Sequence, residues 1–228
     1  MKNNLAIIPA RGGSKRIPKK NIKLFNGMPM IYWSIKALKK TKLFKKIIVS
    51  TDSDEIANIA LKYGVSVPFK RPKKLSDDYS VTSDVMDHAI DYLIKKGENY
   101  KNICCVYATN PFLKPQYLID SYKMFIKSKK KFLFSATEFC YPVQRSFYIN
   151  KNNNIKIFDK KNFGKRSQDL PKLYHDAGQF YWSKSDSWKN RPIIFSSISE
   201  AFILPNHEVV DIDNLDDWKR AEKMIKLQ

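Results

Sequence analysis

IIPARGGSKRIPKKN, residues 7–21, holds the clearest structural signal of the chain. It joins an apolar run to a basic loop with two glycines, and such a run bounded by turn residues is typical of a buried strand over residues 5–9. Glycines let the backbone approach an anion, and successive N–H groups together with Arg11 and Lys15 can neutralise a polyphosphate. The loop lacks the lysine and serine or threonine spacing of a Walker A motif. We therefore predict a strand that opens into a triphosphate-binding loop, with a basic surface turn as the alternative.

Helices and strands alternate after this loop. Apolar residues recur at helical spacing in three segments, and short apolar runs separate these segments. Strands separated by helices of this length pair in parallel through right-handed crossovers, which predicts an α/β fold with a doubly wound, mostly parallel sheet. Ligands of such sheets bind beyond the carboxyl ends of the strands. The predicted helices are Met30–Thr41, 54–63 and 83–96, and the predicted strands after the first are Lys46–Ser50, 65–69 and 103–107.

The second half of the chain alternates less clearly. A strand is predicted at residues 132–137, whereas residues 140–175 are rich in lysine, asparagine and aromatic residues and are typical of a small β excursion or arm. Two further strands, 179–182 and 209–213, precede an amphipathic helix over 215–226. Because 228 residues suffice for one sizeable α/β core, we expect a single domain over residues 1–228 that carries this arm.

The formal net charge of +20 raises the question of a nucleic-acid partner. Only 7 of the 42 basic residues are arginines, the residue type that reads bases and phosphates in a bidentate manner. A solvated, lysine-rich surface is therefore the preferred interpretation, and a basic nucleic-acid-binding protein is the remote alternative. The positive field still favours small polyanionic substrates.

The sequence also indicates the cellular compartment. No apolar run approaches the roughly 20 residues that span a bilayer, and the N-terminus lacks a signal-peptide core, so we expect no membrane partner. Cys104, Cys105 and Cys140 have no metal-ligand spacing, and their odd number makes a poor disulfide framework. We predict reduced, buried cysteines in a cytoplasmic protein.

Two aspartates near the C-terminus, Asp211 and Asp213, flank one apolar residue. Alternate positions of a strand point to the same face, so the two carboxylates can share a metal ion that prefers oxygen ligands, such as Mg²⁺. The alternative is that the pair caps the helix that begins near Leu215. The spacing alone leaves both interpretations open.

A polar segment follows the predicted arm. Arg166, Gln168 and Asp169 come first, and His175 and Gln179 follow in a run that also contains a glycine. Charged and amide groups at this density are typical of a wall that binds a hydroxylated, carboxylated substrate. His175 is a candidate general base or sugar ligand, although a single histidine beside a strand is more often a hydrogen-bonded structural residue.

The stretch IIPARGGSKRIPKKN closely resembles the N-terminal signature of the acylneuraminate cytidylyltransferases, the CMP-sialic acid synthetase group. The resemblance implies a Rossmann-like fold of the nucleotide-diphospho-sugar transferase type and a reaction that consumes CTP. It implies that Arg11 and Lys15 hold the phosphates of CTP and that Asn21 lies beside the cytosine. The loop residues that we expect to contact CTP are Ala10, Arg11, Gly12, Gly13, Ser14 and Lys15.

Other landmarks of this family recur along nearly the whole chain. The triplet STD at residues 50–52, with Glu55, matches a family element. Arg71 and Ser83 stand in segments that resemble those by which the family contacts the nucleotide. Tyr107 stands where relatives have the glutamine of a QPTSP-like turn, which leaves the role of this side chain open.

The resemblance also gives Asp211 and Asp213 the role of Mg²⁺ ligands. The anomeric hydroxyl of the sugar is then expected to attack the α-phosphate of CTP in line with the leaving pyrophosphate. The catalytic residues implied are Arg11, Lys15 and Asp211. A metal-bound hydroxide or one of the carboxylates can accept the proton of the sugar.

Within the family, the segments RSQDL and YHDAGQFYW, at residues 166–170 and 174–182, are most similar to the pseudaminic acid cytidylyltransferases. They imply that the sugar is pseudaminic acid, an acidic nine-carbon sugar, with N-acetylneuraminate and legionaminate as alternatives. The eight-carbon acid sugar of lipopolysaccharide fits least, because its enzymes resemble IPARxxSxRxPGKPL, whereas this chain has Lys15 and KKN at residues 19–21. The resemblance further implies a homodimer formed through the late arm and a product used for surface glycans or flagellin glycosylation.

Overall fold

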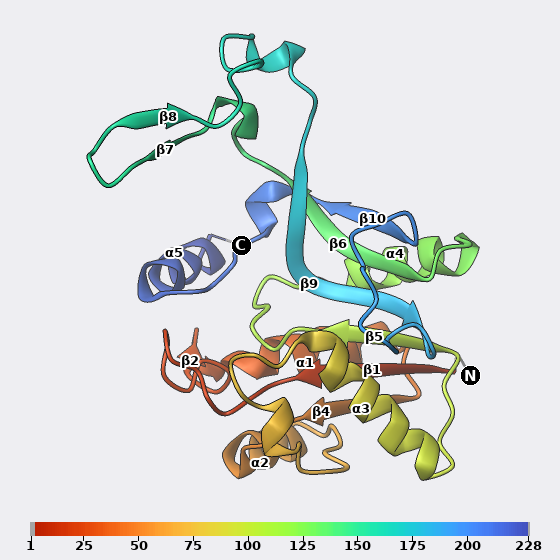
Figure 1. Cartoon of the computed structure of the whole chain (residues 1–228). Coiled ribbons are helices and arrows are strands. Elements are labelled where there is room, and N and C mark those ends of the chain that lie inside the picture. The colour runs from red at the N-terminus through yellow and green to blue at the C-terminus, as the bar shows by residue number, and fades with distance from the viewer. Residues whose placement is uncertain (1–2, 228) are drawn as a thin grey trace.

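Figure 1 shows the computed structural model, which describes residues 3–227 as a mixed six-stranded sheet with helices on both faces and a projecting arm. The strands are β1 (Asn4–Pro9), β2 (Leu24–Phe25), β3 (Met28–Pro29), β4 (Lys46–Ser50), β5 (Asn102–Val106), β6 (Phe132–Glu138), β7 (Phe147–Ile149), β8 (Ile155–Ile157), β9 (Tyr174–Lys184) and β10 (Ser199–Leu204). The α-helices are α1 (Met30–Thr41), α2 (Asp54–Lys62), α3 (Thr82–Lys95), α4 (Pro115–Lys127) and α5 (Leu215–Ile225).

The strand order of the large sheet is β10-β6-β9-β5-β1-β4. β1 pairs in parallel with β4 and β5, and β10 pairs in parallel with β6. β9 runs antiparallel to both of its neighbours, β5 and β6, so it alone opposes the other strands of this sheet. The predicted α/β fold with a mostly parallel sheet is confirmed.

The alternation of side chains along β1 explains why helices cover both faces of the sheet. Ala6 and Ile8 pack in a core with α1, α2 and α4, whereas Leu5 and Ile7 pack in a second core with α3. Successive residues of a strand point to opposite faces, and all four of these side chains are fully buried. The continuous apolar run of β1 is therefore the signature of a strand that is buried on both sides.

A third apolar cluster joins the C-terminal helix to the basic loop. Trp218 of α5 and Ile212, which precedes the helix, pack with Ile17 and Phe25 from the segment that follows β1. Rings of Phe25 and Trp218 meet edge to face, with centroids 5.4 Å apart. This packing brings the segment at residues 209–213 beside the loop at residues 10–21.

Two predicted strands are wrong. Residues 65–69 make one isolated parallel bridge, Ser66 to Ile48, and Lys70 just after them makes another, to Thr51. Pro68 between the two bridges lacks the N–H group that a ladder needs. Residues 209–213 are extended but pair with no strand of the described chain. Their alternating pattern reflects the packing of Ile212 against α5 instead.

Two elements of the sheet region, α4 and β10, were not predicted. α4 buries Leu118, Tyr122 and Phe125 at helical spacing and has Pro115 at its first position, a signal that the sequence did contain. β10 is the edge strand beside β6.

The arm lies within residues 140–175, where β7 and β8 form a hairpin that stands away from the sheet (Figure 1). Cys104 and Cys105 are buried in β5 and free, as predicted, but Cys140 at the base of the arm is exposed, so its predicted burial is wrong. Among residues 3–227, none of the helices is long and apolar enough to cross a membrane.

Candidate active site

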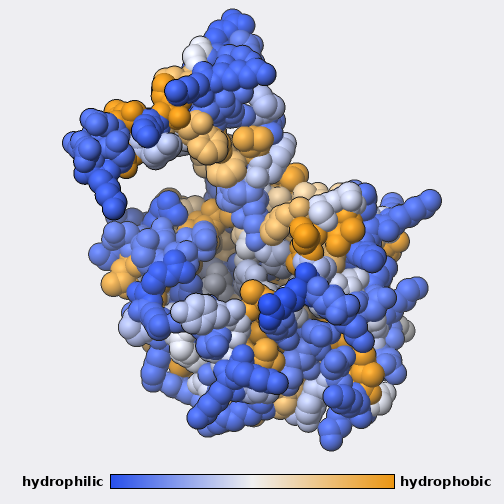
Figure 2. Space-filling view, viewed as in Figure 1, coloured by the Kyte–Doolittle hydropathy of each residue, from blue (hydrophilic) through white to orange (hydrophobic). Residues whose placement is uncertain are grey.

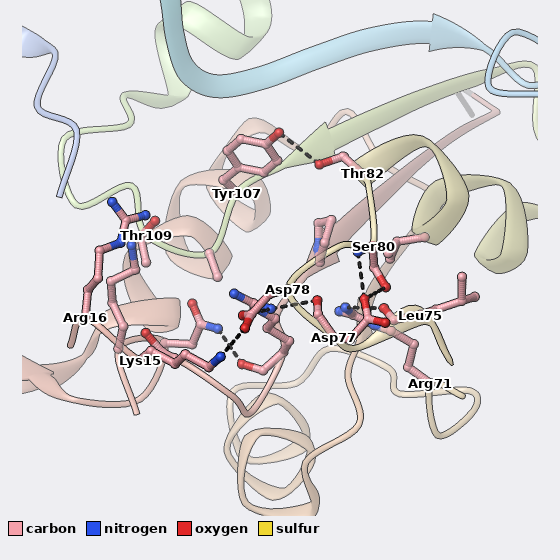
Figure 3. Close-up of a pocket in the computed structure, with 17 residues that line it drawn as sticks. Lys15, Arg16, Arg71, Leu75, Asp77, Asp78, Ser80, Thr82, Tyr107 and Thr109 are labelled. Carbon is pink, nitrogen blue, oxygen red and sulfur yellow. Dashed lines mark hydrogen bonds and ion pairs between the residues drawn. The ribbon is translucent and has the colours of Figure 1, made fainter. Parts of the chain in front are cut away.

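A pocket of 510 Å³ opens at the edge of the sheet where β1, β4 and β5 end. Because these strands are parallel, their carboxyl ends meet at one edge, which is where doubly wound sheets bind ligands. The loop after β1, the segment between α2 and α3, and Tyr107 after β5 all contribute side chains to this first pocket (Figure 3).

The two cations predicted for the phosphates, Arg11 and Lys15, both line the first pocket. Arg11 Nη1 lies 2.9 Å from Asp78 Oδ1 and donates to the carbonyl of Asp77 at 2.7 Å. Lys15 forms an ion pair with the other carboxylate oxygen of Asp78. These charge-assisted bonds lower the pKa of the Asp78 carboxyl group. The sequence interpretation missed Asp78, whose position three residues after Leu75 gave no recognisable signal.

The glycine loop approaches the strand ends closely. The Gly12 N–H donates to Asp52 Oδ1 at 2.8 Å, and a Cβ atom at Gly12 would meet Ser53 Cβ at 3.0 Å. Of the predicted CTP contacts in this loop, Ala10, Gly12 and Gly13 do not line the first pocket. A Cβ atom at Gly13 would meet no atom within 4 Å. The loop backbone at Gly12 therefore packs closely against the side chain of Ser53, which a side chain at position 12 would have to displace.

Ser14, Asn21 and Arg71 also line the first pocket. Asn21 Nδ2 donates to the carbonyl of Arg11 at 2.9 Å, which fixes the loop. Arg71 is buried and donates to both the carbonyl and the hydroxyl of Ser50. Burial lowers the pKa of Arg71 to about 10, with Asp52 opposing the shift. Ser83 does not line the pocket, but its neighbour Thr82 does, at the first position of α3.

A second pocket, of 580 Å³, adjoins the first, because Tyr107 and Thr109 line both. Its other walls come from the end of β6, the start of β9, the segment before α5 and α5 itself. Two adjacent pockets at the carboxyl edge of the sheet can hold two substrates beside each other.

The two aspartates differ in their surroundings. Asp211 lines the second pocket, while Asp213 Oδ2 lies 2.7 Å from Arg16 Nη1 and Asp213 Oδ1 lies 3.8 Å from Lys20 Nζ. Although Asp211 stays accessible to solvent, partial removal from water and the charge of Asp213 raise its pKa. Burial lowers the pKa of Lys20 despite the attraction of both carboxylates.

Neither aspartate caps the last helix. The N-cap of α5 is Asn214, whose Oδ1 accepts from the N–H groups of Asp216 at 2.9 Å and Asp217 at 3.0 Å. Asp217 Oδ2 in turn accepts from the N–H of Asn214, which completes a capping box. The capping interpretation of Asp211 and Asp213 is therefore wrong.

The structure separates the residues predicted for the sugar into two groups. His175 lines the second pocket, where its Nδ1 lies 2.8 Å from the carbonyl of Asp176. Gln179 is buried beside this pocket, and its Nε2 donates to the carbonyl of Glu208 at 3.3 Å while its Oε1 has no partner among the described residues.

The other three predicted sugar residues lie in the arm. Arg166 Nε forms an exposed ion pair with Asp169 Oδ2 at 2.7 Å. Gln168 lines a separate hollow of 320 Å³ at the base of the arm. Within one copy of the chain, these side chains therefore do not share the pocket that contains His175.

Comparisons with known proteins agree with this arrangement. The sequence model of a family described as Cytidylyltransferase matches residues 5–202. The pseudaminic acid cytidylyltransferase of Campylobacter jejuni subsp. jejuni serotype O:2 is 47% identical over 224 residues, which cover 98% of this chain and 97% of the relative. The CMP-N,N'-diacetyllegionaminic acid synthase of the same organism is 33% identical over 232 residues, covering 98% of this chain and 95% of the relative.

A solved structure of CMP:2-keto-3-deoxy-manno-octonic acid synthetase complexed with CTP superimposes with a TM-score of 0.72 at 13% sequence identity. The superposition covers 100% of this chain and 99% of that protein. At this level of identity the likeness concerns the fold.

Proposed function

The chain belongs to the cytidylyltransferase family, and we propose that it joins CMP from CTP to pseudaminic acid and releases pyrophosphate. One observation carries the proposal: a pocket lined by Arg11 and Lys15 adjoins a second pocket through Tyr107 and Thr109. A polyanionic nucleotide fits the first, and a polyhydroxylated acid fits the second.

Arg11 and Lys15 bind the phosphates of CTP in place of Asp78. Phosphoryl transfer depends on positioning and on stabilising charge that develops on the leaving oxygens. Arg11 and Lys15 can exchange the carboxylate of Asp78 for the leaving pyrophosphate and so stabilise its charge. Ser14, Asn21, Arg71 and the residues near Ser83 hold the remainder of the nucleotide, and Ala10, Gly12 and Gly13 shape the loop.

Asp211 and Asp213 fit a Mg²⁺ site. Partial removal from water and then the charge of Asp213 raise the pKa of Asp211, and a divalent cation relieves the repulsion between the two carboxylates. When bound there, Mg²⁺ supplies positive charge to the phosphate oxygens. Arg16 and Lys20 hold Asp213 in place, and Asp211 faces the sugar pocket, where its carboxylate is a candidate acceptor for the sugar proton.

His175 and Gln179 are the proposed sugar contacts within the chain. The relative at 47% identity is named for pseudaminic acid, whereas that at 33% is named for a legionaminic acid, which supports pseudaminic acid as the substrate. N-acetylneuraminate and legionaminate remain the alternatives.

We further propose that the protein is a cytoplasmic homodimer formed through the arm, and that its product serves flagellin glycosylation. Apolar side chains gather along this arm, as Figure 2 shows, and Phe147, Ile149, Ile155 and Phe158 are each more than half exposed. An apolar surface of this kind is typical of a protein interface. Arg166, Gln168 and Asp169 would reach the sugar only if the arm met a second copy. Sedimentation analysis tests the dimer, because a concentration-independent monomer would contradict it.

Release of pyrophosphate tests the proposed activity. Initial rates are measured with CTP, Mg²⁺ and each of pseudaminic, legionaminic and N-acetylneuraminic acid, with UTP in place of CTP as the control. We expect the highest kcat/KM for CTP with pseudaminic acid. A higher value for N-acetylneuraminic acid would contradict the assignment of the sugar.

A further inference from the structure

Glu208 is a buried carboxylate in an otherwise exposed turn. The turn is the short helix η4 (Asn206–Glu208) after β10, where residues 205–207 are exposed and Glu208 is 8% exposed. Residues 205–214 connect the edge of the sheet to α5 (Figure 1). Because a carboxylate loses hydration when it is buried, this one depends on partners within the protein.

The partners of the Glu208 side chain come from the start of α4. Lys114 Nζ donates to Glu208 Oε1 and forms an ion pair with it, and the Tyr117 hydroxyl donates to Glu208 Oε2. Although burial opposes the charge, these two bonds lower the pKa of the Glu208 carboxyl group. Each carboxylate oxygen has its own donor, and charge-assisted bonds of this kind are strong. We call these three residues the Glu208 triad.

The backbone of Glu208 has a partner as well. Its carbonyl accepts from Nε2 of Gln179 in β9 at 3.3 Å. A single residue therefore attaches the turn to α4 through its side chain and to β9 through its main chain. β9 belongs to the large sheet and α4 packs in one of its cores, so the turn is attached to well-packed elements.

The residues that follow Glu208 form one side of the second pocket. The lining residues of this stretch are Val209, Val210 and Asp211, which we call the pocket wall. Residues 209–213 pair with no strand of the described chain, so no sheet ladder holds the pocket wall. Glu208 fixes its beginning. Ile212 fixes its end, because it packs in the third cluster and its carbonyl accepts from Lys20 Nζ at 2.7 Å.

Resting on the proposed function, we propose that Glu208 is a positioning residue that holds Asp211 toward the sugar. Asp211 makes no hydrogen bond or ion pair with residues 3–227, so its place in the pocket depends on its backbone. A displacement of about 1 Å at a reacting group can lower the rate about 100-fold. No member of the Glu208 triad lines either pocket, so the triad acts on the reaction through the pocket wall.

Glu208→Gln tests this proposal because it keeps the size of the side chain and exchanges one acceptor oxygen for a donor NH₂ group. Lys114 or Tyr117 then loses its acceptor. We expect kcat/KM for the acid sugar to fall at least about tenfold. The KM for CTP at saturating Mg²⁺ should stay within about twofold, because the pocket wall does not line the first pocket. Unchanged kcat/KM for the sugar, or a KM for CTP that rises as much, would overturn the proposal.

Glu98→Gln is the matched control. Glu98 has the same two kinds of partner, because Lys46 Nζ lies 2.6 Å from Glu98 Oε1 and the Tyr100 hydroxyl donates to Glu98 Oε2 at 2.6 Å. These three residues lie where β4 and β5 begin, at the opposite edge of the sheet from both pockets. Glu98→Gln should lower Tm, as Glu208→Gln does, but keep kcat/KM for the sugar within about twofold. An equal loss of kcat/KM in both variants would mean that Glu208 acts only through stability.

Hydrogen exchange of the free protein measures the attachment without any substrate. The N–H groups of Glu208 and Val209 donate to carbonyls within the turn, at 3.0 and 3.2 Å. Peptides that cover residues 208–211 should exchange at least about tenfold faster in Glu208→Gln than in the unmodified protein. In Glu98→Gln they should exchange at the unmodified rate. Unaltered exchange in Glu208→Gln would overturn the proposal.

Tyr117→Phe serves if Glu208→Gln melts early. It removes one hydroxyl and keeps the ion pair of Glu208 with Lys114, so kcat/KM for the sugar should fall about threefold. An unaltered value would again overturn the proposal. The acid sugar used is whichever of the three nonulosonic acids the unmodified protein consumes. Failure with all three would contradict the proposed function, and hydrogen exchange would still decide whether Glu208 holds the pocket wall.

Discussion

Replacing Asp211 by asparagine should lower the affinity for Mg²⁺ without destabilising the fold. Asp211 makes no hydrogen bond or ion pair with residues 3–227; its carboxylate is partly removed from water, repelled by Asp213 and attracted by Lys20. The substitution keeps the shape and removes both the repulsion and the attraction, so we expect the free energy of unfolding to change by less than about 0.5 kcal/mol. Loss of even an outer partner of a metal ligand costs about 10- to 100-fold in metal affinity. The Mg²⁺ concentration for half-maximal rate should therefore rise at least about tenfold.

Asn214→Ala is the matched control on the same segment. It removes the bonds of 2.9 and 3.0 Å that cap α5, which should cost about 1 kcal/mol of stability. For a chain of this size, that loss lowers Tm by about 2–4 °C. Its Mg²⁺ dependence should not change.

The assay pairs Mg²⁺ titrations of pyrophosphate release with melting curves for both variants. Asp211→Asn should shift the Mg²⁺ titration and keep Tm, whereas Asn214→Ala should lower Tm and keep the Mg²⁺ titration. The reasoning would be refuted if Asp211→Asn kept the Mg²⁺ titration of the unmodified protein, or if its Tm fell as far as that of Asn214→Ala.

Three further predictions concern the first pocket and pH. Arg11→Ala and Lys15→Ala should each lower kcat/KM about 100-fold with the fold intact, and unchanged turnover would exclude this loop from phosphate binding. Asp78→Asn should lower the KM for CTP about threefold, because the phosphates no longer compete with a carboxylate; a raised KM would contradict this. Because the pKa of Asp211 is raised, acidification at low Mg²⁺ should lower the rate at a higher pH than protonation of an ordinary carboxyl group would. Added Mg²⁺ should shift this fall in rate to lower pH.

Local patterns predicted the first half of the fold well. α1 and β4 have the predicted bounds because apolar spacing and flanking turn residues act within a few positions of each other. The same reasoning failed at residues 65–69, where Pro68 interrupts the pairing, and at residues 209–213, where Ile212 packs on a helix. An apolar pattern reports burial, but it does not report which element covers the side chain.

The candidate site was predictable where it is continuous in sequence. Arg11, Ser14 and Lys15 belong to one loop after β1, so the stretch that predicts the strand also predicts the cations. Asp78 reaches these cations from a different loop, and this contact depends on where β4 and α3 lie. Contacts of that kind arise from topology and leave no local signal.

The residues predicted to bind the sugar are close in sequence but not in the structure. Arg166 and His175 are nine positions apart, yet one lies in the arm and the other lines the second pocket. The chain leaves the arm and enters β9 between them. The converse also holds, because Thr82 and Tyr107 are 25 positions apart in the sequence, yet their hydroxyl oxygens lie 3.1 Å apart in the fold.

The identity of the nucleotide product tests the proposed reaction. The protein is incubated with CTP, Mg²⁺ and an equimolar mixture of pseudaminic, legionaminic and N-acetylneuraminic acid. The products are separated by chromatography and identified by mass spectrometry, with authentic standards to distinguish isomers. We expect CMP-pseudaminic acid to dominate and to appear with one pyrophosphate per molecule. Accumulation of CMP-N-acetylneuraminic acid with pseudaminic acid left unconsumed would contradict the claim.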